Sequence, residues 1–139
     1  MERNTVLQPF LSHLAHERDT CTRLLGLFMS GKNRDAVKLD VLNFWQQDLR
    51  RHVDAEEAAL IPFLQRHHFN QQLTALIHRE HDTIRILADR LLKDKESDYL
   101  FEVFIKLVHQ HLLFEDKVVF HHIEETIPAP ELAQLRLVA

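Results

Sequence analysis

Four long stretches of this chain carry apolar residues every three or four positions, a spacing that is typical of amphipathic helices. These stretches are residues 5–29, 36–66, 71–93 and 98–126. The chain has only two glycines and four prolines, which leaves little turn material for a sheet protein. No stretch has the alternating pattern of a strand. The spacing therefore predicts an all-α protein.

The segments between the four predicted helices are short and polar, and short connections force neighbouring helices to run antiparallel. Asn70 and Ser97 are suited to begin the third and fourth helices, because their side chains can accept from free backbone N–H groups. We expect an up-down-up-down antiparallel four-helix bundle that forms one domain over residues 1–139. The tail at 131–138 is expected to form a short fifth helix.

The bulk composition excludes several classes of partner. The net charge is only −4 and the basic residues form no block, so we expect no nucleic-acid partner and no attraction to anionic membranes. No apolar run approaches the roughly 20 residues that span a bilayer. Cys21 is the only cysteine, which excludes an internal disulfide, and the first residues have no signal pattern. We expect a cytoplasmic protein.

The composition is unusual only in its eleven histidines. Two of the predicted helices carry a His-x-x-x-Glu pair near their midpoints, and the other two carry a histidine there; the same spacing also occurs away from the midpoints, at His13 with Glu17 and at His121 with Glu125. These six candidate metal ligands are His16, His52, Glu56, His81, His111 and Glu115. Midpoints of antiparallel helices of similar length share one layer, so four imidazoles are expected at one level. Each glutamate lies one turn from its histidine on the same helix face.

The candidate ligands interrupt stripes that are otherwise apolar and face inward. An unpaired carboxylate buried in such a stripe is costly or takes up a proton. Two carboxylates beside four imidazoles need a shared positive charge, and a pair of divalent metal ions satisfies that requirement. Imidazole and carboxylate without thiolate suit iron, manganese or zinc. The alternative is a polar core without metal.

A weak internal repeat relates the first two predicted helices to the last two. The segment His-Leu-Ala-His at 13–16 corresponds to His-Arg-Glu-His at 78–81, and both His-x-x-x-Glu helices end in a double histidine. The repeat predicts two halves that are related by an approximate two-fold axis along the bundle.

The strings around these ligands resemble the hemerythrin-like, or HHE cation-binding, family. The matching segments are LAHER at 14–18, HVDAEEAALIP at 52–62, EHD at 80–82 and HLLFED at 111–116. The second segment is the most specific, because it adds a doubled acid and a closing proline to the ligand pair. The resemblance covers residues 5–127. It implies a non-haem site with two iron ions that are joined by an oxo or hydroxo bridge. Such a site binds a small diatomic ligand such as O₂ or NO.

The chain departs from the oxygen-carrying hemerythrins, which have a His-x-x-x-His pair on the third helix. Here Ile77 and Arg85 stand four residues either side of His81. The symmetric variety with four histidines and two glutamates fits better, and for that variety the resemblance suggests sensing, iron handling or protection under oxidative or nitrosative stress. His13 and His78 each lie three residues before a candidate ligand, and we interpret them as neighbours of the site or occasional ligands.

Several alternatives stay open at this point. Glu17 is a weaker candidate carboxylate on the first helix, Glu57 is a neighbour of the site, and Asp116 is the alternative to Glu115. Cys21 is expected to be a small core residue. A redox enzyme that turns over peroxide or NO, and a metal-free helical interaction module, are the competing functions. The sequence leaves the metal, the gas and the oligomeric state, including a homodimer, undetermined.

Overall fold

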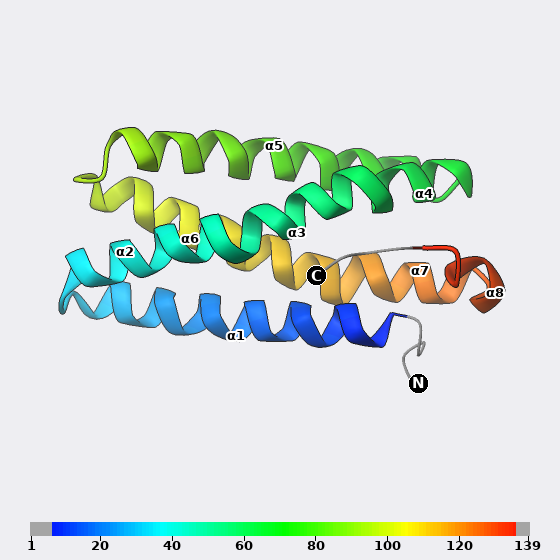
Figure 1. The fold of residues 1–139 in the computed structure, drawn as a ribbon, viewed down its shortest axis with the longest axis horizontal. Coiled ribbons are helices and arrows are strands. Elements are labelled where there is room, and N and C mark those ends of the chain that lie inside the picture. Colours follow the sequence, from blue (N-terminus) through cyan, green and yellow to red (C-terminus); the bar gives the residue numbers. More distant parts are fainter. Residues whose placement is uncertain (1–6, 136–139) are drawn as a thin grey trace.

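The computed structural model of the chain describes residues 7–135, and it is an antiparallel four-helix bundle (Figure 1). The bundle is built from four long helical rods, each of which is one helix or a run of consecutive helical segments. The first and third rods are single helices, α1 (Gln8–Ser30) and α5 (Gln71–Lys93). The second rod runs through α2 (Arg34–Phe44), η1 (Trp45–Leu49), α3 (Arg50–Ala55), η2 (Glu56–Leu60) and α4 (Ile61–Arg66). The fourth rod runs through α6 (Asp98–Phe114), η3 (Glu115–Val119) and α7 (Phe120–Thr126). Residues 7–135 contain no strand, and the predicted fold class is confirmed.

The predicted helix starts rest on side chains that satisfy free backbone N–H groups. Asn70 Oδ1 accepts from the N–H of Leu73 at 3.1 Å, and Ser97 Oγ accepts from the N–H of Leu100 at 3.2 Å. Both predicted caps are therefore confirmed. The first helix ends at Gly31, whose φ of 76° lies in the left-handed region that glycine adopts without strain.

The segments η1, η2 and η3 are π-helical turns inside rods that otherwise continue as α-helix. The N–H of Ile61 bonds to the carbonyl of Glu56, and the N–H of Phe120 bonds to that of Glu115. Each of these bonds spans five residues instead of four. Such turns insert about one residue into a helix and are frequent at functional sites. Two of the three begin at a glutamate that the sequence predicts to be a ligand.

The short C-terminal helix is confirmed but begins earlier than predicted. It is α8 (Ala129–Leu132), whereas the expectation was 131–138. The reason is Pro130, because proline is favoured in the first turn of a helix, where its missing N–H is not needed. Leu132 and Leu135 are buried. The rest of the predicted tail, from residue 136, lies outside the described residues.

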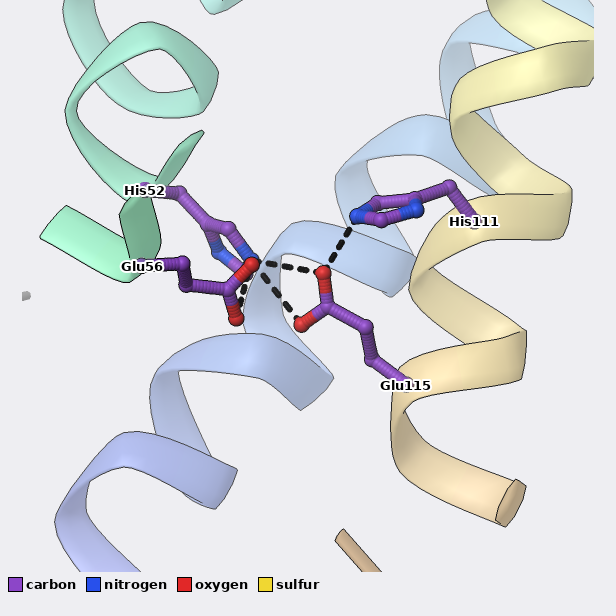
Figure 2. A group of neighbouring side chains, drawn as sticks. All are labelled: His52, Glu56, His111 and Glu115. Atoms are coloured by element: carbon purple, nitrogen blue, oxygen red, sulfur yellow. Dashed lines mark hydrogen bonds and ion pairs between the residues drawn. The ribbon is translucent and has the colours of Figure 1, made fainter. Parts of the chain in front are cut away.

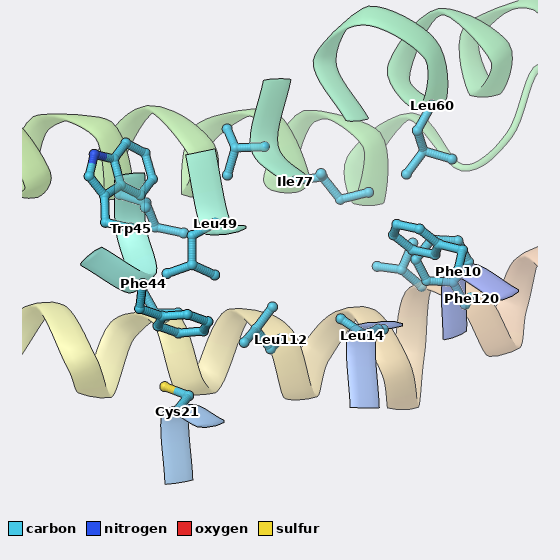
Figure 3. Close-up of a cluster of buried hydrophobic side chains, with 14 of the residues drawn as sticks. Phe10, Leu14, Cys21, Phe44, Trp45, Leu49, Leu60, Ile77, Leu112 and Phe120 are labelled. Carbon is cyan, nitrogen blue, oxygen red and sulfur yellow. The ribbon is translucent and has the colours of Figure 1, made fainter. Parts of the chain in front are cut away.

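Buried apolar side chains form the core, and those labelled in Figure 3 lie in two layers at different positions along the bundle. One layer contains Phe10, Leu14, Leu60, Ile77 and Phe120. The other contains Cys21, Phe44, Trp45, Leu49 and Leu112. A fully buried leucine or phenylalanine stabilises a fold by about 1.5–3 kcal/mol, so these layers hold the helices in register. Cys21 is buried and is a core residue, as expected; this burial raises the pKa of its thiol to about 12, and the charge of Glu17 adds to the effect.

Candidate metal centre

Four ligand atoms, one each from His52, Glu56, His111 and Glu115, lie within 4.8 Å of one another at the middle of the bundle (Figure 2). His52 Nε2 is 3.1 Å from Glu56 Oε2 and 3.1 Å from Glu115 Oε2. His111 Nε2 contacts Glu115 Oε1. All four side chains are buried. The two His-x-x-x-Glu segments therefore face each other across the bundle, as their spacing predicts.

His81 of α5 adds a third imidazole to this group. Its Nε2 atom lies 2.9 Å from Glu56 Oε1 and 3.8 Å from Glu115 Oε1. Its ring meets the ring of His111 edge-on, with the centroids 5.0 Å apart. Five of the six predicted ligands thus come together, and three imidazole Nε2 atoms converge on two central carboxylates.

His16 is the predicted ligand that the structure does not bring to this group. Its side chain is exposed, whereas the neighbouring Glu17 is fully buried. Successive residues of an α-helix point about 100° apart, so the two cannot both face inward. The inner face of α1 is formed by Leu14, Glu17 and Cys21. The helix midpoint indicates the correct height for His16 but not the direction in which its side chain points.

Each of the three buried imidazoles also bonds to an outer carboxylate through its other nitrogen. The Nδ1–H groups of His52, His81 and His111 donate to Glu17 at 2.6 Å, Glu57 at 2.9 Å and Glu80 at 2.6 Å, respectively. This bond fixes the orientation of each ring, so that Nδ1 faces outward and Nε2 faces the centre, the arrangement found around metal-binding histidines. Glu80 could not be selected from the sequence, because its role depends on a contact between two helices.

A family model for the hemerythrin HHE cation-binding domain matches residues 8–123, which is most of the chain. The chain belongs to this family. No curated protein and no solved structure matches it. The matched range contains every residue of the histidine and glutamate group, so in this HHE domain the group that could hold a metal lies within the part of the chain that defines the family.

The remaining candidates surround the centre of the HHE domain without joining its central carboxylates. His78 Nδ1 lies 2.5 Å from Glu57, and about half of the His78 side chain is exposed. His13 Nε2 is 3.8 Å from Glu17. Asp116 accepts from Arg18 Nη1 at 2.5 Å, and the carboxylate in the central group is Glu115. No helix within residues 7–135 combines the length and apolar character needed to cross a bilayer.

The central carboxylates dominate the electrostatics of the site. Burial alone would lower the pKa of each imidazole, but Glu56 and Glu115 outweigh it. The pKa of His81 rises to about 10 and that of His111 to about 9, and the pKa of His52 is also well above its ordinary value. The HHE domain therefore places a strong attraction for positive charge at this level, which either protons or a metal ion can satisfy.

The two central carboxylates themselves differ in ionisation. Burial opposes the charged form of both. For Glu115 the neighbouring His52 and His111 overcome this effect and hold its pKa well below the usual range. For Glu56, burial and the charge of Glu115 raise the pKa. Two like charges this close resist ionising together unless a cation lies between them.

Two atoms of the centre show directly that its polar groups are incompletely satisfied by the protein. Within residues 7–135, Glu56 Oε2 and His111 Nε2 are buried and have no hydrogen-bond partner of adequate geometry. A buried polar atom without such a bond is destabilising. Both atoms could act as ligands to a metal ion, and the combination of imidazole and carboxylate suits iron, manganese or zinc. The residues present therefore fit a metal centre.

Proposed function

We propose that this HHE domain is a cytoplasmic non-haem iron protein that binds a small diatomic ligand, O₂ or NO, at its buried centre. The observation that carries this proposal is the convergence of three imidazole Nε2 atoms on two carboxylates, all five groups being almost completely buried. Iron bound there would supply an open coordination position for the gas and an electron to stabilise it. Sensing or protection under oxidative or nitrosative stress is the matching role.

Two ions, if bound, would be held by Glu56 and Glu115 together with the three imidazoles. The Oε1 atoms of both glutamates lie on the side of His81 and His111. The Oε2 atoms of both lie 3.1 Å from His52, which is 3.3 Å from the Oε1 atom of Glu115. Glu56 could therefore offer one oxygen to each position, and Glu115 Oε1, which lies close to both His111 and His52, could serve either.

The protein around the centre keeps it dry and orders its ligands. Phe10 packs on the ring of His52 at 5.5 Å between centroids, and Leu14 and Leu60 are fully buried nearby in the same apolar layer. Exclusion of water slows the loss of a bound gas and strengthens the attraction between cation and carboxylates. The outer glutamates hold the imidazoles so that Nε2, not Nδ1, faces inward.

Anaerobic reconstitution with Fe(II), followed by gel filtration and iron analysis, tests this proposal. The wild-type chain should retain at least about one iron, and its visible spectrum should change when NO or O₂ is added. Glu115→Gln should retain almost none, because a neutral amide replaces a central carboxylate. The exposed Glu96→Gln is the matched control and should behave as wild type. Absence of retained iron in the wild type would overturn the proposal.

A further inference from the structure

The outer glutamates, Glu17 and Glu80, show which residues of the two halves of the bundle correspond to each other. This correspondence differs from the one that the repeated histidines at 13–16 and 78–81 suggest. Glu17 accepts from His52 just as Glu80 accepts from His111, and both distances are 2.6 Å. This equivalence pairs Glu17 with Glu80. The sequence agrees, because Glu-x-Asp-Thr occurs at 17–20 and again at 80–83. The repeat must therefore be shifted by two residues from the pairing of 13–16 with 78–81.

In this register the counterpart of His81 is Arg18, not His16. The contacts of the two side chains confirm the equivalence. His81 bonds through Nδ1 to Glu57, the acid that follows one central glutamate. Arg18 bonds through Nη1 to Asp116, the acid that follows the other. Both side chains thus occupy corresponding places, one in each half.

Arginine cannot replace histidine as a ligand. The guanidinium group has no lone pair to offer and stays protonated at all ordinary pH values. His81 presents Nε2 to the central carboxylates at 2.9 Å, and Arg18 presents a fixed positive charge in the corresponding place. That charge is only partly exposed, at 27% of the side chain, so solvent screens it incompletely.

We infer that the two ion positions of the centre are unequal, an inference that rests on the proposed function. The position beside His81 and His111 has two imidazoles and two carboxylate oxygens. The position beside His52 lacks its second imidazole, because Arg18, which is paired with Asp116, occupies that place. The HHE domain binds one ion tightly and a second at least about tenfold more weakly, the minimum effect expected from a defect in ligation.

Titration of the metal-free protein with Co²⁺, followed by calorimetry, tests the inference without depending on gas binding. Wild type should show one tight ion and a weaker second one. Arg18→His should supply the missing imidazole and give two ions of similar affinity. Arg18→Leu removes the charge without adding a donor, so the affinities should stay unequal. Arg23→His makes the same exchange at an exposed position of α1 and should match wild type.

Arg18→His also removes an ion pair with Asp116, so a second variant guards against misfolding. Arg18→His with Asp116→Glu reproduces the pairing of His81 with Glu57 and should likewise bind two ions, with melting curves of the metal-free proteins as the folding check. Two equally tight ions in wild type, or unequal binding in both histidine variants, would overturn the inference while leaving the proposed function intact. A wild-type chain that binds neither Co²⁺ nor Fe²⁺ would overturn both.

Discussion

The half of the bundle formed by α1 to α4 and the half formed by α5 to α7 carry the same His-x-x-x-Glu segment, yet they support it differently. In both halves a π turn begins at the central glutamate and an outer glutamate holds the histidine. They differ where Arg18 stands in the first half and His81 in the second. Matching π turns and outer hydrogen bonds thus persist in the two halves, while the difference between Arg18 and His81 makes the two inferred ion positions unlike.

Substitution of the two equivalent histidines, His52 and His111, is expected to have the most unequal effects on the two halves. His111→Ala removes a ligand of the tight position and should weaken binding of the first ion by about 100-fold or more. His52→Ala removes a ligand of the weak position and should change the first affinity by less than about tenfold. Co²⁺ titration of both variants measures these affinities. Equal losses of affinity for the first ion in the two variants would contradict the inequality of the two ion positions.

The free energy of unfolding should depend on pH, and near neutrality the sign of this dependence should differ between the metal-free and the metal-loaded protein. In the metal-free protein the pKa values of His81 and His111 are about 10 and about 9, above the ordinary value near 6.5. The folded state then holds protons that the unfolded state has lost, so the free energy of unfolding should fall as pH rises from 6.5 toward 10. The lowered pKa of Glu115 gives a separate loss of stability as pH falls below its ordinary value of 4.5.

In the metal-loaded protein the dependence near neutrality reverses. The ligands must be neutral imidazoles and ionised carboxylates, so acid should release the metal as pH falls toward and below about 6.5. Urea unfolding of both forms across this range measures the slopes. His16→Asn should leave both profiles unchanged, because that side chain is exposed. A metal-free stability that rises with pH above 7 would contradict the arrangement.

A smaller effect is expected from the outer glutamates. Glu80→Gln weakens the bond that orients His111 and should lower the first ion affinity by about 10- to 100-fold. Glu17→Gln acts on His52 and should leave the first affinity nearly unchanged while it weakens the second. Co²⁺ titration again distinguishes them. If Glu17→Gln were the more damaging of the two, the tight position would belong to the first half.

The smallest expected effect on the free energy of unfolding comes from removing a side-chain cap at the start of a helix. Ser97 caps α6 with its side chain, and Asn70 caps α5, whereas α1 and α2 have no side-chain cap. Ser97→Ala should lower the free energy of unfolding by about 1 kcal/mol. Ser12→Ala, at an exposed position inside α1, should be neutral or slightly stabilising, because alanine is the better helix former. Equal losses in urea unfolding would contradict the role of the cap.

The sequence predicted the bundle well because its signals are local. Apolar spacing and the side chains of Asn70 and Ser97 determine where α5 and the fourth rod lie, and the observed bounds of 71–93 and 98–126 are those predicted. The π turns were not foreseen, since one inserted residue hardly alters a pattern of three- and four-residue spacing. Proline in the first turn of α8 was a usable signal that the prediction did not apply.

The site was predicted less completely, because height along a helix and direction around it are separate quantities. His16 lies at the right height, but the apolar spacing of Leu14 and Cys21 already indicates that Glu17 is the inward residue between them. The repeated Glu-x-Asp-Thr string would have paired Arg18 with His81. The role of Glu80 could not be read from one chain segment, since its bond to His111 depends on how α5 packs against α6.

The π turns at Glu56 and Glu115 also tie the length of the chain to its function. Each adds about one residue, which rotates everything beyond it by about 100° relative to an uninterrupted helix. The inward faces of α4 and α7, with Phe63, Leu64 and Ile123, depend on that rotation. A variant that lacks one residue of either π turn could bury the imidazoles or the apolar side chains beyond the turn, but not both. A deletion within either turn is therefore expected to disturb the centre or the terminal core, even where it spares the central glutamates.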